Sequence, residues 1–332
     1  MVYDGARNEV VLFGGIVNNS QVLGDTWAWN GLNWIQKSPP NSPPPRFGHA
    51  MAYDAARHEV VLFGGISENG SGSGETWVWN GATWTQVFAA TSPPPRDLAA
   101  MTYDSVRGET VMFGGRDLRS GSGTFGSLLD DTWLWDGVNW TQALPAMHPA
   151  ARIEHAITFD ASRAEVLLFG GRLGVFPSDF GDTWVWNGVN WTERFPATSP
   201  APTGGHALVY DAVGGQAILF GGYDNGAFSR NDTWSWNGTD WTQLVPASNP
   251  PARTNHAMAY DSIFREIVLF GGGSSPGADT GNFNDTWVFE DNLRVPQTKD
   301  DCKGGGWTDF VRANGTPFKN QGACVSYVNT GR

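Results

Sequence analysis

The sequence has little cysteine, little positive charge and no long apolar run. Its 332 residues include 2 cysteines, which by themselves are too few to complete a zinc site. Lysine and arginine number 21 against 33 aspartate and glutamate, a net charge of -12, so electrostatics disfavour nucleic acid and anionic lipid as partners. No apolar run is long enough to span a bilayer, and we expect no membrane insertion.

Sequence signatures of the common enzyme classes are also missing. The chain has no Gly-x-Ser-x-Gly nucleophile motif, no phosphate-binding loop, no His-Glu-x-x-His helix and no paired His/Cys spacing. We therefore predict no catalytic residue, no metal site and no cofactor. Catalysis by unrepeated residues on variable loops stays open as an alternative.

Tryptophan, in contrast, is abundant and falls on a grid. The motif DTWVWNGVNW at residues 182–191 occurs in five similar copies. A second motif, Phe-Gly-Gly, recurs every 50 to 56 residues from Phe13 to Phe270. A repeat of this length is typical of solenoids, propellers and arrays. The five complete copies of the grid place tryptophan at Trp27, Trp29, Trp34, Trp77, Trp79, Trp84, Trp133, Trp135, Trp140, Trp184, Trp186, Trp191, Trp234, Trp236 and Trp241.

Each repeat reads as four short strands. In the second copy, β-rich runs at 48–53, 59–63, 75–79 and 83–87 are separated by turn residues, and helical spacing of apolar residues is not sustained. Asn80-Gly81 predicts a tight hairpin between the last two runs. Four antiparallel strands repeated six times predict an all-β, six-bladed β-propeller.

The repeat resembles the kelch repeat, whose marks are a Gly-Gly pair closing the second strand and spaced aromatics in the third and fourth. An Arg-x-x-His opening, such as Arg46 with His49, recurs in three copies, whereas Ala99 and Thr203 replace one of its residues in two others. The resemblance implies a kelch-type propeller over residues 1–298 and a small module over 299–332. Met1 aligns with Met51, so the first strand is expected to be truncated at the N-terminus.

Repeated polar and aromatic residues are expected to be structural. We predict that the tryptophans pack between blades, although stacking on sugar rings is the rival hypothesis. Carboxylates open the third strands, and we expect them to cap loop amides, with calcium binding as the alternative. Histidines of the innermost strands could ring a central channel. The carboxylates are Asp25, Glu75, Asp131, Asp182, Asp232 and Asp285, and the histidines are His49, His155, His206 and His256.

Function is expected at the end of the propeller that carries the connections between second and third strands and the proline-rich links between blades. These loops differ in length and content on a rigid frame, which is how repeat proteins place binding surfaces. Unrepeated arginines and aromatics there are the residue types of binding hot spots. The predicted ligand-binding residues are Arg116, Asp117, Arg119, Phe125, Arg172, Phe176, Phe180, Tyr223, Asp224, Phe228 and Arg230.

The C-terminal module holds both cysteines. Cys302 and Cys324 enclose a short loop, and we predict a disulfide between them, with two free thiols as the alternative. The stretch from CKGGGW to FKNQGACV resembles a module found at the ends of exported bacterial proteins. An oxidising compartment and an acidic surface together favour an extracellular or cell-envelope location in a bacterium.

The sequence therefore predicts a secreted, non-catalytic scaffold that binds a protein or carbohydrate partner through its variable loops. An extracellular carbohydrate-active enzyme with a site on those loops is the first alternative. A structural component of the cell envelope is the second.

Overall fold

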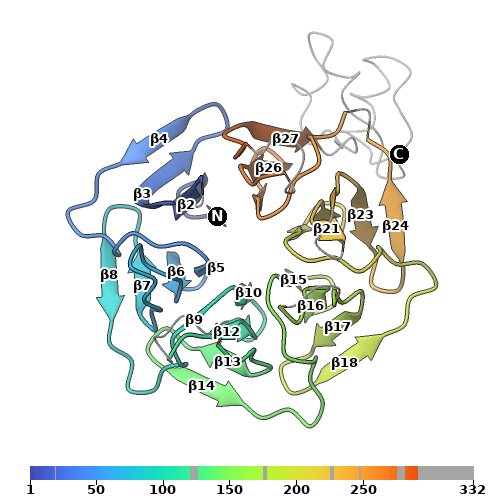
Figure 1. The fold of residues 1–332 in the computed structure, drawn as a ribbon, viewed down its shortest axis with the longest axis horizontal. Coiled ribbons are helices and arrows are strands. Elements are labelled where there is room, and N and C mark those ends of the chain that lie inside the picture. Colours follow the sequence, from blue (N-terminus) through green and yellow to red (C-terminus); the bar gives the residue numbers. More distant parts are fainter. Residues whose placement is uncertain are drawn as a thin grey trace, which may run out of the picture.

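The computed structural model describes residues 1–18, 20–119, 126–174, 178–224, 228–246, 248–274 and 281–290. These residues form six sheets of three or four strands, which we number blades 1 to 6 in chain order, arranged in a closed ring around a central channel (Figure 1). The all-β, six-bladed propeller is thus confirmed. Nowhere in this described part does a helix have the length and apolarity that crossing a membrane requires.

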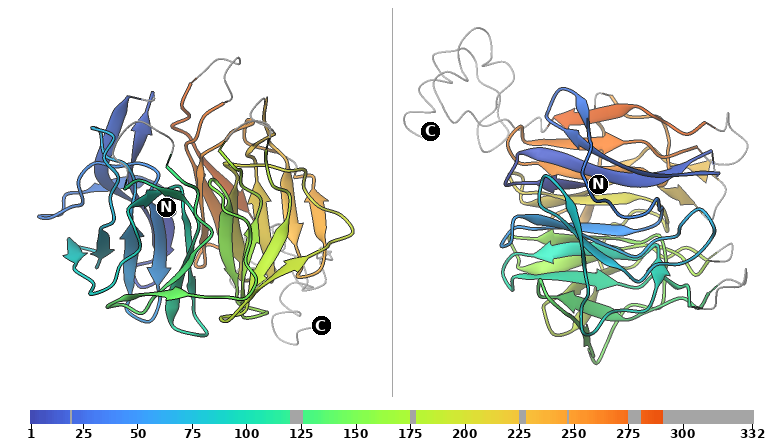
Figure 2. Two further views of the ribbon diagram at one scale, coloured as in Figure 1. Left: turned by 60° about the horizontal axis from the view of Figure 1, so that its bottom comes forward. Right: turned by 90° about the vertical axis from the view of Figure 1, so that its left-hand side faces the viewer.

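Every blade is an antiparallel meander whose first strand faces the channel and whose last strand lies outermost (Figures 1 and 2). The strands are β1 (Val2–Asp4), β2 (Glu9–Val17), β3 (Gln21–Trp29) and β4 (Trp34–Lys37) in blade 1; β5 (Ala50–Asp54), β6 (Glu59–Phe63), β7 (Thr76–Trp79) and β8 (Trp84–Val87) in blade 2; β10 (Ala100–Asp104), β11 (Glu109–Phe113), β13 (Thr132–Trp135) and β14 (Trp140–Ala143) in blade 3; β15 (Ala156–Asp160), β16 (Glu165–Phe169), β17 (Thr183–Trp186) and β18 (Trp191–Arg194) in blade 4; β19 (Ala207–Asp211), β20 (Gln216–Phe220), β23 (Thr233–Trp236) and β24 (Trp241–Leu244) in blade 5; and β25 (Ala257–Asp261), β26 (Glu266–Phe270) and β27 (Thr286–Glu290) in blade 6. Two short pairs, β9 (Arg96–Asp97) with β12 (Arg116–Asp117) and β21 (Tyr223–Asp224) with β22 (Phe228–Ser229), complete the described strands.

The turns within each blade form as the sequence predicts. In blade 2, Trp79 pairs with Trp84 across the Asn80-Gly81 hairpin, where Asn80 Oδ1 accepts backbone N–H bonds from the turn and Gly81 has a φ of 92°. Gly64 and Gly65 follow β6 with positive φ, and a Cβ on Gly64 would lie 2.4 Å from the Arg96 carbonyl oxygen. The Gly-Gly pair therefore permits a close backbone approach between neighbouring blades.

The hydrophobic core is divided among the joints, by which we mean the contacts between neighbouring blades. Six clusters of buried side chains each combine residues of two adjacent blades. In blade 4, Trp184 and Trp186 face blade 3, whereas Val185 faces blade 5. A blade exposes two apolar faces, and each is covered only when its neighbours are in place.

Among the described residues, tryptophans form the centre of five of the six joints, the exception being the joint between blades 5 and 6. Trp191 of blade 4 packs edge-on against Phe113 of blade 3, and its Nε1 donates to Thr132 Oγ1 of blade 3 over 2.9 Å. The joint buries a large apolar ring and satisfies its one polar atom. Packing between blades is thereby confirmed for the eight most buried tryptophans, and sugar stacking is wrong for them: Trp79, Trp84, Trp135, Trp140, Trp186, Trp191, Trp236 and Trp241.

The same contact closes the ring between blade 6 and blade 1. Trp34 Nε1 donates to Thr286 Oγ1 over 2.8 Å, and the Trp34 ring lies 5.2 Å from that of Phe270. Blade 6 contributes three strands among the described residues, and its Phe289 packs on Phe220 of blade 5. The sequence does not predict how the ring closes. The structure closes it through a side-chain joint between two separate sheets.

A buried arginine opens four of the blades and holds three segments together. Arg152 pairs with both carboxylate oxygens of Asp182 over 2.7 and 2.8 Å and donates to the carbonyl oxygens of Ala150 and Gly170. This bidentate, fully bonded geometry offsets the cost of burying the charge. Equivalent pairs join Arg46 to Glu75, Arg96 to Asp131 and Arg253 to Asp285.

The carboxylates that open the third strands therefore do not cap loop amides, and that prediction was wrong. Asp182 accepts the Arg152 guanidinium and the Nε1 of Trp184, the latter over 2.7 Å. The arginine lies 30 residues earlier in the chain, so local pattern alone did not pair it with this carboxylate.

A second arginine joins the blades at the opposite end of the ring. Asp54 Oδ1 accepts the backbone N–H groups of Ala56 and Arg57, and Asp54 Oδ2 pairs with the Arg57 guanidinium at 2.6 Å. Arg57 also donates to the carbonyl oxygen of Asp136 in blade 3. Arg7, Arg107 and Arg163 likewise donate to carbonyl oxygens of the next blade.

The histidines lie inside the joints, so the hypothesis that they ring the channel was wrong. Each precedes its first strand and sets its ring edge-on to a phenylalanine of the preceding blade at 5.4 to 5.6 Å: His49, His155, His206 and His256. His155 Nε2 lies 3.2 Å from the Phe113 carbonyl oxygen. Burial lowers the pKa of His206 to about 4 and that of the other three to about 3.

Replacing a joint tryptophan is expected to destabilise the whole ring. Trp186→Ala should lower the free energy of unfolding by about 3–5 kcal/mol, because it leaves a cavity in a joint that cannot collapse. Urea denaturation measures this loss. The exposed Val189→Ala in the following hairpin serves as the control and should change little. Unchanged stability in Trp186→Ala would show that the grid does not support the fold.

Acid is expected to unfold the protein through the buried histidines. Their pKa values are lowered in the fold, so the unfolded chain binds more protons than the folded one below about pH 6.5. Stability is fully present above that pH and falls as pH drops toward 4, by about 1.4 kcal/mol per pH unit for each histidine. Melting temperatures across this range measure the slope. His155→Gln should make it shallower, whereas the exposed His58→Gln should not.

Candidate functional site

The connections between second and third strands meet the openings of the first strands at one end of the ring, which we call the loop face. In blades 2 to 6, the residue after the Gly-Gly pair forms a bridge with the residue after the opening arginine position. Each of these blades therefore brings unrepeated residues of two loops side by side. The bridged pairs are Phe47 with Ile66, Asp97 with Arg116, Ile153 with Arg172, Gly204 with Tyr223, and Thr254 with Gly273.

The next residue of each opening has a left-handed backbone. Glycine occupies this position in blades 2 and 5, as Gly48 and Gly205. Leu98, Glu154 and Asn255 occupy it in the other three blades with φ of 54°, 57° and 54°. A side chain at positive φ is uncommon and strained, and such residues cluster at functional sites. Glycine is sufficient for the fold at this position, as Gly48 and Gly205 show. The side chains of Leu98, Glu154 and Asn255 are therefore not needed to form the blade.

Blade 3 carries a nearly buried ion pair on this face. Arg116 donates to both carboxylate oxygens of Asp97, from Nε over 3.1 Å and from Nη2 over 2.5 Å. The Asp97 side chain is 2% exposed. Burial raises the pKa of Asp97, and the Arg116 guanidinium opposes that rise.

A network of three residues spans blades 4 and 5. Glu154 accepts a bond from Arg172 Nη2 over 3.0 Å through one oxygen and from the Tyr223 hydroxyl through the other. The Arg172 guanidinium also lies 5.3 Å from the centre of the Tyr223 ring. Burial, and then the Glu154 carboxylate, raise the pKa of Tyr223, so its hydroxyl remains a donor.

The ion pairs of blades 3 and 4 are not needed to form the propeller. Blade 2 has Phe47, Gly48 and Ile66 at the corresponding positions, and blade 6 has Thr254, Asn255 and Gly273. Both blades form the same bridge without an ion pair at these positions. Burying charged groups costs free energy unless they are fully bonded. The ion pairs of blades 3 and 4 are therefore features of the loop face rather than of the repeat.

Five other predicted residues lie further out on the same loops: Asp117, Arg119, Asp224, Phe228 and Arg230. Arg119 pairs with Asp117 at 2.5 Å and stays largely exposed, while Arg230 lies 3.3 Å from Asp224. Phe228 is 73% exposed. Exposed arginine and phenylalanine beside fixed ion pairs provide the contact groups that binding surfaces favour.

Phe180 does not belong to the site. Its ring lies beneath the buried Arg152 guanidinium at 4.0 Å, and Phe283 lies beneath Arg253 in the same way at 4.2 Å. Phe180 is therefore part of the repeated framework, and its prediction as a ligand-binding residue lacks support from its position. Phe125 and Phe176 lie outside the described residues, as do Cys302 and Cys324, whose disulfide stays a prediction.

Two acidic residues of the site were missed from the sequence. Asp97 and Glu154 fall inside the Arg-x-x-His opening, which reads as a repeated structural motif. The signal that could have found them is the variability of the two inner positions, which are Phe-Gly, Asp-Leu, Ile-Glu, Gly-Gly and Thr-Asn in turn. Because these positions vary between blades, a charged residue at one of them is not required by the repeated fold and indicates a function specific to that blade.

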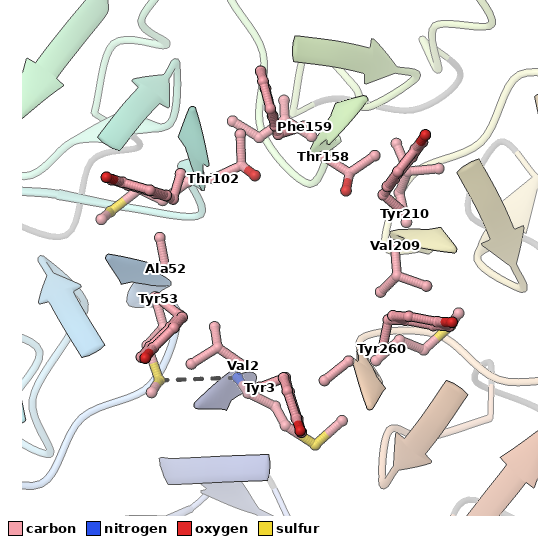
Figure 3. Close-up of a pocket in the computed structure, with 18 of the residues that line it drawn as sticks. Val2, Tyr3, Ala52, Tyr53, Thr102, Thr158, Phe159, Val209, Tyr210 and Tyr260 are labelled. Carbon is pink, nitrogen blue, oxygen red and sulfur yellow. Dashed lines mark hydrogen bonds between the residues drawn. The ribbon is translucent and has the colours of Figure 1, made fainter. Parts of the chain in front are cut away.

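A cavity of about 350 Å³ lies in the central channel, and the innermost strands line it (Figure 3). Tyr3, Tyr53, Phe159, Tyr210 and Tyr260 lie around it. The hydroxyl groups take part in the joints: the Tyr53 hydroxyl accepts the Ala6 N–H over 2.9 Å, and the Tyr210 hydroxyl accepts the Ser162 N–H over 3.2 Å. We therefore assign these rings to blade packing rather than to the candidate site.

Comparison with known proteins gives one family. Residues 1–192 match the model of the KLHDC2/KLHL20/DRC7 Kelch-repeats domain, which is more than half of the chain. No curated protein matches the chain.

The ion pair of blade 3 is expected to act as a unit. Arg116→Ala should destabilise the protein by about 2 kcal/mol, because it leaves the Asp97 carboxylate buried without its partner. Arg116→Ala combined with Asp97→Asn should cost less than Arg116→Ala alone, since no unpaired charge remains. Chemical denaturation of both variants measures this. A double variant that is as unstable as Arg116→Ala, or less stable, would contradict this expectation.

Proposed function

The chain belongs to the Kelch-repeat domain family, and we propose that it is a non-catalytic scaffold whose loop face binds a partner protein. The kelch propeller fold commonly mediates protein binding. The observation that carries the proposal is the Glu154, Arg172 and Tyr223 network, which blades 2 and 6 lack at the same positions. A carbohydrate partner is the alternative that the binding experiment distinguishes.

The network supports binding because it is held in place before a partner arrives. Glu154 is fixed by two bonds and by its backbone conformation, and Arg172 is held between Glu154 and the Tyr223 ring. Groups fixed in advance lose less conformational entropy on association. On the same face, Arg119 of blade 3 and Phe228 of blade 5 remain exposed for contact.

Export from a bacterial cell is part of the same proposal. It rests on the acidic composition and on the expected bond between Cys302 and Cys324, which would form in an oxidising compartment. The resemblance of the C-terminal stretch to modules of exported proteins supports it as well.

Binding is expected to depend on the exposed residues Arg119 and Phe228 of the loop face. Arg119→Ala and Phe228→Ala, alone and together, should weaken binding about tenfold or more while leaving the melting temperature nearly unchanged, because both side chains are exposed. The partner is first selected with wild-type protein from a displayed protein library and, in parallel, from a glycan array. Titration of each variant then gives its affinity, and the array shows whether a carbohydrate is the ligand instead.

The control lies at the opposite end of the ring. Val138→Ala changes an exposed hairpin residue there and should leave binding intact. Arg57→Ala is unsuitable as a control, because Arg57 donates to the Asp136 carbonyl of the next blade and its loss would loosen a joint. Full binding by the Arg119→Ala, Phe228→Ala double variant, or equal loss in Val138→Ala, would remove the loop face as the site.

A further inference from the structure

Blade 6 lacks an arginine that four other blades carry at the end of the ring opposite the loop face. In those blades the arginine stands three residues after the aspartate that ends the first strand, and its guanidinium pairs with Oδ2 of that aspartate. The four arginines are Arg7, Arg57, Arg107 and Arg163. In blade 6 the aspartate is Asp261, and Phe264 stands at the arginine position.

The contacts of Arg7 show which oxygen atoms this position serves. Nη1 of the guanidinium pairs with Asp4 Oδ2 over 2.7 Å and donates to the carbonyl oxygen of His58 over 3.0 Å, while Nη2 donates to the carbonyl oxygen of Asn80. One carboxylate of blade 1 and two backbone carbonyls of blade 2 thus share one positive charge. At the joint between blades 6 and 1, the equivalent oxygens belong to Asp261, Asn8 and Asn30.

The backbone at this joint has the same geometry as at the joint between blades 1 and 2. Asn8 and Gly31 have φ of 55° and 92°, against 57° and 92° at the equivalent positions of blade 2. The Phe264 ring lies over Gly31 as the Arg7 side chain lies over Gly81. Phe264 therefore covers the hairpin of the next blade, but it brings no hydrogen-bond donor to the three oxygens.

One oxygen of the Asp261 carboxylate is buried without a partner among the described residues. Oδ1 accepts the backbone N–H groups of Ile263 and Phe264 over 2.9 and 3.2 Å. Asp261 is 0% exposed, and its Oδ2 accepts no hydrogen bond from any residue that the structure describes. A buried carboxylate costs free energy unless a donor or a cation satisfies it. Asp261 therefore needs a positive charge from outside its own turn.

Blade 5 also lacks the arginine, but it removes a negative charge at the same time. Gly214 stands at the arginine position, and Gln216 replaces the glutamate that opens the second strand of the other blades. A Cβ on Gly214 would lie close to both Asp211 Oδ2 and Gln216 Nε2, so the amide lies near the carboxylate. Blade 6 keeps both of its carboxylates, Asp261 and Glu266. It loses the arginine without the compensation that blade 5 shows.

We propose that a monovalent metal cation, Na⁺ or K⁺, binds between blades 6 and 1 in the place that a guanidinium takes at other joints. Its protein ligands are Asp261 Oδ2 and the carbonyl oxygens of Asn8 and Asn30, and water completes its coordination. Carboxylate and carbonyl oxygens suit hard cations, and one positive charge matches the guanidinium that blade 6 lacks.

The donor set also explains why the sequence does not predict this site. The described residues contain no group of three or more histidine, cysteine, aspartate or glutamate side chains that could hold a metal ion. Two of the three proposed ligands are backbone atoms, which leave no motif in the sequence. A divalent ion would meet a single carboxylate here, whereas calcium sites gain affinity from several.

Melting temperatures of the full-length protein in different chloride salts test the proposal. At an equal ionic strength of about 0.15 M, the melting temperature should be about 2–4 °C higher in sodium or potassium chloride than in choline chloride, whose cation is too large for the site. The difference between the sodium and potassium salts shows which ion binds more tightly. Equal melting temperatures in all three salts would overturn the proposal, and stabilisation by calcium chloride alone would overturn the assignment to a monovalent ion.

Two substitutions in blade 6 should remove the response to the cation by different routes. Asp261→Asn keeps an Oδ1 for the N–H groups of the turn and removes the charge, so it should be at least as stable as wild type in choline chloride. Phe264→Arg supplies the guanidinium from within the chain, and its melting temperature in choline chloride should reach the value of wild type in sodium or potassium chloride. A response that persists in either variant would show that the cation acts elsewhere.

Blade 2 offers the converse substitution. Arg57→Phe reproduces the arrangement of blade 6 beside Asp54, so the variant should lose stability in choline chloride and regain part of the loss in sodium or potassium chloride. Its response to the cation should therefore exceed that of wild type, and a response no larger than that of wild type would overturn the proposed set of ligands. Arg119→Ala and Phe228→Ala should keep the wild-type response, because both residues lie on the loop face. The cation site is thereby tested separately from the proposed partner site.

Discussion

Burial of an indole ring in the face of the preceding blade is the contact on which this structure depends. A four-stranded blade has two apolar faces and cannot cover either alone. Trp84, Trp140, Trp191 and Trp241 each cover a phenylalanine of the previous blade and donate to its threonine, and Trp34 repeats the contact on blade 6. The ring is stable because the fifth such contact closes it.

The two ends of the ring are held by two different sets of arginine hydrogen bonds. On the loop face, Arg152 and its equivalents fix the Gly-Gly turn against the opening of the third strand. At the other end, Arg57 and its equivalents reach the carbonyl groups of the next blade. In both sets a planar guanidinium bonds to several acceptors at once, which stabilises its charge where it is buried. The loops therefore project from blades that are held rigidly against one another.

Specific chemistry arises where one blade departs from the repeat. Blades 3 and 4 place ion pairs at positions that blade 2 fills with Phe47, Gly48 and Ile66, and one of these pairs recruits Tyr223 from blade 5. The other blades define what the repeat requires, so these ion pairs are additions made by individual blades on the loop face.

The sequence by itself determined the strands, the hairpins and the number of blades, because β-period, turn residues and the tryptophan grid are local or periodic signals that one blade expresses fully. It also located the face on which Arg116, Arg172 and Tyr223 lie. Only the tertiary structure decided how the ring closes, that Asp182 holds Arg152 instead of capping its own loop, and that the histidines are buried. Asp97 and Glu154 became visible for the same reason: each meets its partner through a bridge between separate loops, and spacing along the chain does not encode which loops the propeller brings together.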